Sequence, residues 1–400
     1  MEGIKGTKAT AISYAKAIDD TAREQIARMC DYDFAIGSKI RIMPDVHAGK
    51  GCTIGTTMTV TDKVVPNIVG VDIGCGMYTV RLNTTTVDFP HFDEAAHFVP
   101  SGMNVWDKPQ EAFDLKRLYC YEKLKNISWV ENSIGTLGGG NHFIEIDRSK
   151  DGVYYLVIHT GSRNLGKQVA EIYQEIAIDL HVGKAVYEQQ VANLIAEYKA
   201  SGRQKEIQDA LKTLKENRHN TSIPEDLCFV YGEHLDAYLH DVEICQEFAR
   251  RNRERIAQIL LEFTRINGSD DFHTIHNYID TNEMILRKGA IAAHNGEKVL
   301  IPINMRDGSI LAVGKGNSDW NYSAPHGAGR IMSRKQAKET LTVTDYQNAM
   351  EGIYTTSVGA DTLDEAPMAY KSIDDILSVI GDTVEVLDIL KPVYNFKAAE

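Results

Sequence analysis

The residues of this sequence best suited to chemistry are a cysteine, an aspartate and several histidines that stand beside glycines. Asp72 and Cys75 lie three residues apart in the segment 70–77, GVDIGCGM. Glycines between and after them let the backbone turn tightly, so both side chains can converge on one point. A carboxylate and a thiolate at one point are a metal-ligand pair. Taken alone, the segment is equally well explained as a glycine-rich turn around a buried cysteine.

Histidines in two further segments are candidates for the same ion. In the segment 138–145, GGGNHFIE, three glycines precede the Asn-His pair that ends in His142. They expose backbone N–H groups, which suits a phosphate cradle, and they leave His142 free to reach a shared metal. The apolar strand predicted at 154–158, YYLVI, runs into His159 and then TGSR. Binding and catalytic residues are common where a buried strand ends in an accessible loop, because the rigid strand fixes the first polar residue.

Two more histidine segments follow. FHTIHNY at 272–278 holds His273 and His276, which would share a face if the segment were helical. SAPHGAGR at 323–330 places His326 on a loop of small residues ahead of a helix expected to begin near Arg330. Histidines without such neighbours, His294 among them, are interpreted as ordinary core or surface residues.

The number of candidate ligands bears on the number of metal ions. One thiolate, one carboxylate and several imidazoles exceed the four ligands of a single tetrahedral site. Either two ions share the thiolate or some of the histidines have another role. Zinc, iron, cobalt and manganese all remain open on the type of ligand alone.

The elements that must hold these side chains belong to a large globular protein. Its 400 residues are 43% hydrophobic and 25% charged, which excludes a disordered or fibrous chain. The net charge is −13, so the surface as a whole should repel nucleic acid, and phosphate binding must come from a local cluster. No stretch reaches the ~18 apolar residues of a membrane span, and no signal peptide is recognisable. We expect a soluble, cytoplasmic protein that makes no membrane contact.

Strand and helix patterns share the chain without a repeat or an obvious linker. Residues 41–82 are predicted to be glycine-punctuated strands, including one at 68–71, and strands return at 298–304 and 309–313. Between these, residues 165–266 predict long amphipathic helices, one of which carries a basic face with Arg253 that we interpret as solvated. Glycine-rich motifs lie on both sides of the helices. The sequence therefore predicts one α+β domain over residues 1–400, with mixed β-sheets carrying the site and a helical insertion around 165–266.

Five of these motifs together resemble the RtcB family of GTP-dependent RNA ligases. The similarity runs from Asp45 to Lys397 and includes DxxC at 72–75, GNHF at 140–143, HTGSR at 159–163, HN at 276–277 and HGAGR at 326–330. All five occur in the family order, which chance explains poorly. The resemblance implies the α+β fold of that family, an active site with two manganese ions, and GTP as a cosubstrate.

The resemblance also implies a role for each motif residue. Cys75 would bridge the two Mn²⁺ ions, with Asp72 and His142 completing the protein ligands of one ion and His159 and His276 those of the other. His326 would be the catalytic nucleophile. The nucleotide contacts that it implies are Asn141, His142, Phe143, Ile144, Glu145, His276, Asn277, Pro302, Ile303, Asn304, Met305, Ser309, His326, Gly327, Ala328, Gly329 and Lys397.

One segment departs from the family pattern. Where the family commonly has Pro-Gly-Ser/Thr-Met, this chain has Pro302-Ile303-Asn304-Met305. Isoleucine is β-branched and disfavours positive φ, whereas glycine accepts it. The substitution therefore puts the backbone geometry beside the nucleotide in question.

The leading functional hypothesis is an RNA ligase. It would join RNA ends that carry a 2′,3′-cyclic phosphate or 3′-phosphate to 5′-hydroxyl RNA ends, through an enzyme-histidine-GMP intermediate and a GMP-capped RNA 3′ end. The alternative is a metal-dependent cyclic phosphodiesterase that processes RNA ends but no longer ligates. A non-catalytic RNA-binding subunit is disfavoured, because it would need no metal ligands and the net charge is acidic. The physiological RNA, the oligomeric state and an activating protein partner are left open.

Overall fold

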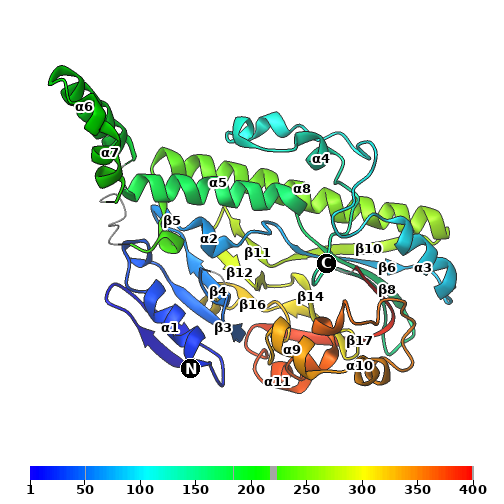
Figure 1. The fold of residues 1–400 in the computed structure, drawn as a ribbon. Coiled ribbons are helices and arrows are strands. Elements are labelled where there is room, and N and C mark those ends of the chain that lie inside the picture. Colours follow the sequence, from blue (N-terminus) through cyan, green and yellow to red (C-terminus); the bar gives the residue numbers. More distant parts are fainter. Residues whose placement is uncertain (50, 183, 217–222, 399–400) are drawn as a thin grey trace.

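Two large β-sheets carry most of the described strands of this α+β fold (Figure 1). The structure, a computed structural model, describes residues 1–49, 51–182, 184–216 and 223–398. The six-stranded sheet is mixed, because β2 and β3 run parallel while the other neighbours are antiparallel. Its strands, in spatial order, are β1 (Glu2–Lys5), β2 (Thr10–Ser13), β3 (Ile40–His47), β4 (Ile54–Thr59), β12 (Ile285–Lys288) and β11 (Asn277–Asp280).

The seven-stranded sheet is antiparallel throughout. Its strands, in spatial order, are β10 (Gly268–Ile275), β6 (Gly76–Leu82), β8 (Tyr154–Thr160), β7 (Phe143–Arg148), β17 (Val384–Lys397), β15 (Gly308–Gly314) and β14 (Lys298–Asn304). Two short pairs accompany the sheets: β13 (Ala290–Ala292) with β16 (Ser323–Pro325), and β5 (Lys63–Val64) with β9 (Val230–Tyr231).

Two long helices, α5 (Arg163–Val182) and α8 (Glu233–Thr264), lie side by side over the sheets (Figure 1). On α8, Ile256 and Leu260 are fully buried in one apolar cluster with Ile144 of β7 and Leu156 of β8. Burial of each such side chain contributes about 1.5–3 kcal/mol, so α8 is held firmly on the strands that bear the site. The remaining helices are α1 (Asp20–Met29), α2 (Pro66–Val69), α3 (Phe89–Phe98), α4 (Ile127–Glu131), α6 (Lys184–Ala200), α7 (Ile207–Glu216), α9 (Arg334–Thr340), α10 (Val343–Ala349) and α11 (Ile373–Leu377).

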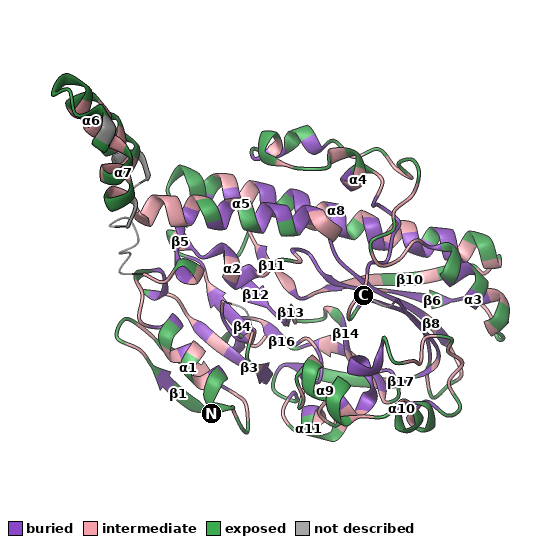
Figure 2. Ribbon diagram, viewed as in Figure 1, coloured by how far each residue is buried: buried purple, intermediate pink, exposed green. Residues whose placement is uncertain are grey.

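Helices α6 and α7 project from the body, and none of their described side chains is buried (Figure 2). Together with α5 and α8 they form the helical segment predicted around residues 165–266. The predicted α+β fold class is confirmed. No helix in the described part of the chain is long and apolar enough to cross a membrane. All six cysteines are free and buried.

Two local predictions were wrong. Residues 68–71 are not a strand, because Pro66 opens the short helix α2, and the fixed φ of proline suits the first position of a helix. The basic face of α8 is not solvated throughout, because Arg253 is fully buried. Its Nη1 donates to the carbonyls of Gly74 and Thr160 at 2.7 and 2.9 Å. Arg253 thus ties α8 to the segments that lead into and out of the site.

Candidate active site

The antiparallel order of four strands gathers the predicted metal ligands at one edge of the seven-stranded sheet. Cys75 directly precedes β6 and His142 directly precedes β7, while His159 lies near the end of β8 and His276 directly follows β10. Neighbouring antiparallel strands bring the start of one to the end of the next, and the register pairs Phe143 with His159 and Gly76 with Thr160. Residues far apart in the sequence therefore meet by topology.

The first group of possible ligands consists of Asp72, Cys75 and His142, whose ligand atoms all lie within 4.8 Å of one another. His142 Nε2 lies 3.1 Å from Asp72 Oδ2 and 3.6 Å from Cys75 Sγ. The close approach of Asp72 depends on Gly161, where a Cβ would collide with the Asp72 carboxylate. The backbone N–H of Ser162 donates to Asp72 Oδ1 at 3.2 Å and helps to fix it.

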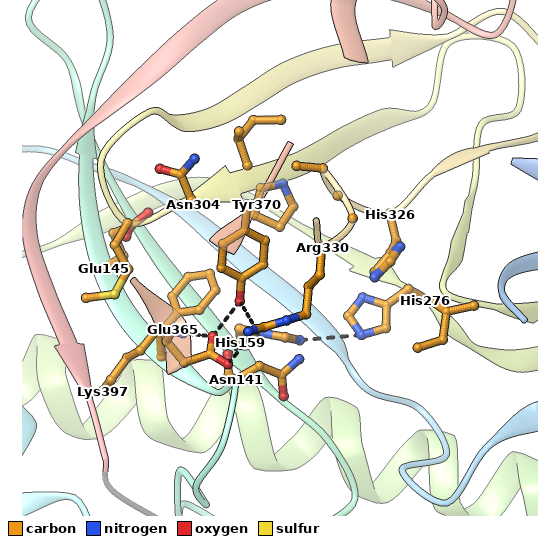
Figure 3. A pocket seen from close by; sticks show the side chains of 18 of the residues that line it. Asn141, Glu145, His159, His276, Asn304, His326, Arg330, Glu365, Tyr370 and Lys397 are labelled. Atoms are coloured by element: carbon orange, nitrogen blue, oxygen red, sulfur yellow. Dashed lines mark hydrogen bonds and ion pairs between the residues drawn. The ribbon is translucent and has the colours of Figure 1, made fainter. Parts of the chain in front are cut away.

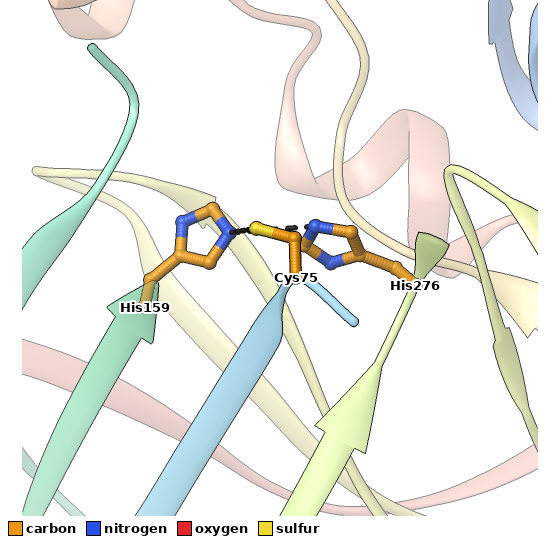
Figure 4. Close-up of side chains that lie close together, drawn as sticks. All are labelled: Cys75, His159 and His276. Carbon is orange, nitrogen blue, oxygen red and sulfur yellow. Dashed lines mark hydrogen bonds between the residues drawn. The ribbon is translucent and has the colours of Figure 1, made fainter. Parts of the chain in front are cut away.

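The second group consists of Cys75, His159 and His276, whose ligand atoms also lie within 4.8 Å of one another. Figure 4 shows the Cys75 thiol between the two imidazoles, each coming from a different strand end. His159 Nε2 lies 3.3 Å from Cys75 Sγ and 3.4 Å from His276 Nε2. Cys75 belongs to both groups, so the geometry fits two ions that share one thiolate.

Hydrogen bonds turn two of the imidazoles toward the centre. His142 Nδ1 lies 3.0 Å from the Leu137 carbonyl, and His159 Nδ1 lies 3.1 Å from the Asn141 carbonyl. A carbonyl only accepts, so each Nδ1 carries the proton and each Nε2 presents a lone pair. Burial, reinforced by His142, lowers the pKa of His159 well below its ordinary value. Burial and His159 do the same to the pKa of His276, so both rings are neutral and ready to bind metal.

The acidic ligands respond to the same burial. Burial is the largest influence on Asp72, but the hydrogen bond and charge of His142 help to bring its pKa below the ordinary value. Burial and the neighbouring Asp72 raise the pKa of Cys75 well above its ordinary value. A bound cation reverses that effect, because a coordinating thiol loses its proton outright. The surroundings therefore keep Cys75 as a protonated thiol until a cation binds and favours the thiolate.

His326 lies beside the centre and is held by a carboxylate. Its Nδ1 lies 2.7 Å from Oδ2 of Asp45, a residue of β3 that is fully buried. The rings of His326 and His276 are 5.1 Å apart between centroids. Because the Asp45 carboxylate accepts a hydrogen bond from Nδ1–H, the lone pair of the neutral ring lies on Nε2.

A cavity of about 250 Å³ opens in front of these histidines. Figure 3 shows His276 and His326 on one side of it and Glu145 and Lys397 on the other. The predicted nucleotide contacts that line it are Asn141, Phe143, Glu145, His276, Pro302, Ile303, Asn304, Met305, His326, Gly327, Ala328, Gly329 and Lys397. It is also lined by His47, Ile54, His159, Arg330, Arg334, Glu365, Tyr370 and Asn395.

A charged cluster forms one wall of the cavity. Glu365 is 2% exposed, and its Oε2 accepts from Lys397 Nζ and from the Tyr370 hydroxyl, both at 2.7 Å. Its Oε1 lies 2.7 Å from Nη1 of Arg334. Burial opposes the charge, but Lys397 and Arg334 outweigh it and lower the pKa of Glu365 to about 2. Lys397 is therefore held in place by Glu365, with Nζ 5.7 Å from the centroid of the Phe143 ring.

Four predicted nucleotide contacts do not line the cavity. His142 faces the metal ligands, and Ile144 is fully buried in the apolar core on the other face of β7. Asn277 Oδ1 accepts from the Gly289 N–H, and Ser309 is fully buried behind the wall. The segment with Ile303 belongs to β14 and contains a register shift between Pro302 and Asn304. Ile303 is not among the described residues with positive φ, so the backbone there does not require glycine.

Sequence reasoning missed or misplaced several residues of the site. Asp45 was noted only as the start of the family similarity, and nothing marked Glu365, Tyr370 or Asn395. The pair His273 and His276 does not share a helical face, because β10 and the residue after it are extended. The helix expected near Arg330 begins at Arg334 instead, which leaves Arg330 free to reach the cavity.

The fold brings together a cluster of possible metal ligands and an adjoining cavity, and comparisons with known proteins identify the family. A family model described as tRNA-splicing ligase RtcB matches residues 25–118 and 119–398. The RNA-splicing ligase RtcB of Escherichia coli K12 is 30% identical over 95% of both chains. The tRNA-splicing ligase RtcB of Aeropyrum pernix is 27% identical over 84% of this chain and 83% of its own. The chain belongs to the RtcB family, as the motifs predicted.

Proposed function

We propose that this protein is a GTP- and Mn²⁺-dependent RNA ligase that joins 3′-phosphate or 2′,3′-cyclic-phosphate ends to 5′-hydroxyl ends. The observation that carries the proposal is the placement of His326, whose Nε2 is free beside the metal-ligand cluster while Asp45 holds Nδ1. A relative that matches nearly the whole chain is named an RNA-splicing ligase, and so is the family whose model matches. The shared Cys75 supports two ions with Asp72 and His142 on one side and His159 and His276 on the other.

His326 is the nucleophile of the first step. Its Nε2 attacks the α-phosphorus of GTP, an N–P bond forms, and the bond to the pyrophosphate leaving group breaks. Bound Mn²⁺ supplies positive charge to neutralise the phosphate oxygens. Asp45 accepts the hydrogen bond from Nδ1–H and stabilises the positive charge that the ring acquires as Nε2 bonds to phosphorus.

The guanylate on His326 then passes to RNA. The oxygen of an RNA 3′-phosphate attacks the guanylate phosphorus, the N–P bond breaks, and the RNA end becomes capped with GMP. A 5′-hydroxyl attacks the terminal RNA phosphorus, GMP leaves, and a phosphodiester remains. A 2′,3′-cyclic phosphate must first be opened by water to the 3′-phosphate. The substrates in this scheme are GTP and RNA with broken ends. A cytoplasmic location remains an expectation from the sequence, and a possible activating protein partner stays open.

Glu145 and Lys397 are the groups we assign to the base of GTP. Guanine presents N1–H and N2–H₂ as adjacent donors, whereas adenine presents an acceptor at N1 and no amino group at C2. A carboxylate in the cavity wall pairs with the guanine edge and leaves adenine with an unpaired contact. Lys397, near the C-terminus, would donate a hydrogen bond to the nucleotide, and Glu365 holds its Nζ in position.

Intact-mass measurement after incubation with GTP and Mn²⁺ tests this function. The protein should gain one covalent GMP, His326→Ala should gain none while keeping its metal, and His294→Ala should label as the unaltered chain does. A cyclic phosphodiesterase that cannot ligate would open cyclic phosphates without a GMP adduct. Wild-type labelling of His326→Ala would contradict the assignment of the nucleophile.

A further inference from the structure

Behind the cavity wall lies a second carboxylate that the reaction scheme does not use. Phe143, Glu145 and Asp147 occupy alternate positions of β7 and therefore share one face of the sheet. Phe143 and Glu145 line the cavity, whereas Asp147 lies one step further along the strand and is fully buried. On the same face, Phe143 packs in an apolar cluster with Val157, Leu300 and Leu390.

Asp147 lacks the hydrogen bonds that a buried carboxylate requires. Neither of its oxygens has a hydrogen-bond partner within the part of the chain that the structure describes. The Ser309 hydroxyl, which acts on Asp147, and Oδ1 of Asn395, whose amide donates to Glu145, are also buried without a hydrogen-bond partner among the described residues. Buried polar atoms are normally paired, because each unpaired one costs about 1–3 kcal/mol. A proton on Asp147 would turn one of its oxygens into a donor and let it bond to a neighbouring acceptor.

The charges nearby are too few for two anions. Lys397 is the cation that acts on Glu145, and it already forms its contact with Glu365. Glu145 Oε2 accepts only a neutral donor, Nδ2 of Asn395, at 2.5 Å. Glu145 and Asp147 are both buried, lie two residues apart on one face of β7 and act on each other, so ionisation of one opposes ionisation of the other. Burial and the Glu145 charge raise the pKa of Asp147 well above its ordinary value, and Ser309 lowers it less.

We propose that Asp147 is a neutral carboxylic acid that donates a hydrogen bond to Glu145 and so fixes Glu145 as the anionic acceptor for the nucleotide base. A carboxylate offers about four lone-pair positions. Asn395 and the Asp147 proton occupy two, and two remain for the adjacent donors of guanine. The role of Asp147 in positioning Glu145 for the base rests on the proposed use of GTP. The protonation of Asp147 itself does not depend on that proposal.

The consequence is a specificity that depends on where one proton resides. Without Asp147, Glu145 would be buried with one neutral donor and would take up a proton more readily. A protonated Glu145 presents a donor beside an acceptor, which complements N1 and N6–H₂ of adenine. Asp147→Ala should therefore lower the ratio of guanylylation to adenylylation by about tenfold or more. Asp147→Asn keeps an N–H donor of the same size toward Glu145 and should retain the preference for GTP.

Infrared spectroscopy of the metal-free, nucleotide-free chain at neutral pH tests the proton directly. The carbonyl band of a protonated carboxyl group should be present, absent in Asp147→Asn, and retained in Asp151→Asn, whose exposed aspartate lies in the same hairpin. A wild-type chain without the band, a band that survives Asp147→Asn, or an unchanged GTP-to-ATP ratio in Asp147→Ala would overturn the proposal. Failure of the wild-type chain to take up GMP would instead reject the proposed ligase activity, and the band would still decide the state of Asp147.

Discussion

The reactivity of His326 depends on which of its two nitrogens carries the proton. Asp45 is fully buried and 2.7 Å from Nδ1, so it favours the tautomer with the proton on Nδ1 and the lone pair on Nε2. The other oxygen of Asp45 has no hydrogen-bond partner in the described chain. His326 is therefore the side chain to which the Asp45 carboxylate is bonded, and in the proposed reaction Asp45 would stabilise the charge that the ring acquires.

Asp45→Asn should slow formation of the GMP adduct by about 10²–10⁴-fold. The amide can donate to Nδ1 as easily as it accepts, so the proton can move to the nitrogen that must attack. Metal content should not change, because Asp45 lies outside both ligand groups. Rapid-quench labelling with radioactive GTP measures the rate, and Asp62→Asn, an exposed aspartate, is the control. A wild-type rate would show that Asp45 does not direct the tautomer.

Cys75→Ala should remove both metal ions, because Cys75 belongs to both ligand groups. Loss of a ligand from one group alone, as in His276→Ala, should weaken one ion more than the other. Elemental analysis after dialysis measures the manganese retained. Cys120→Ala replaces another buried thiol and should keep the metal. Full manganese content in Cys75→Ala, with retained guanylylation, would return Cys75 to a structural role.

At the scale of elements, the site exists because four antiparallel strands begin or end at the same edge and a glycine lets α5 start close to them. Gly161 joins the end of β8 to the start of α5, and its missing side chain makes room for the Asp72 carboxylate. Arg253 of α8 then holds the carbonyls of Gly74 and Thr160 from behind. Ligand geometry is thus set by backbone segments as well as by the ligands.

Gly161→Ala should lower manganese affinity by about 10–100-fold, because its Cβ displaces Asp72 without removing any ligand. Gly381→Ala is a matched control, since nothing lies within 4 Å of the Cβ position there. Titration of each metal-free variant with Mn²⁺ gives the two affinities. If Gly161→Ala binds as tightly as Gly381→Ala, the close approach of Asp72 is not what holds the ion.

The sequence could predict the candidate metal ligands at the strand ends, but not the residues that hold the site in place. His142, His159 and Cys75 stand beside glycines or at the end of an apolar run, so local patterns mark them. Asp45 lies inside a strand and meets His326 across 281 residues, a contact that no local pattern encodes. Arg253 has basic neighbours on α8, and only tertiary packing separates it from their exposed face.

At the scale of the whole molecule, an acidic protein gathers positive side chains at one cavity. The net charge is −13, yet the cavity wall holds Arg330, Arg334 and Lys397 around Glu365. These cations give phosphate a local attraction that the overall charge does not. Behind the candidate metal ligands, Nε of the buried Arg253 donates to Nδ1 of His273 at 3.4 Å.

Protonation of His273 links the stability of the whole fold to pH. Burial, reinforced by the charges of Arg253 and Arg250, lowers the pKa of His273 from 6.5 to about 3, although Glu254 lies 3.2 Å from its Nε2. The unfolded chain binds this proton below pH ~6.5 and the folded chain only below about 3, so the free energy of unfolding falls as pH drops between these values. By pH 5 the loss is about 2 kcal/mol. Denaturant unfolding of metal-free protein at pH 7 and pH 5 measures it, and His273→Gln should lose about 2 kcal/mol less than the unaltered chain. Other titrating groups act on both chains alike, so equal losses would show that His273 is protonated in the folded state at pH 5.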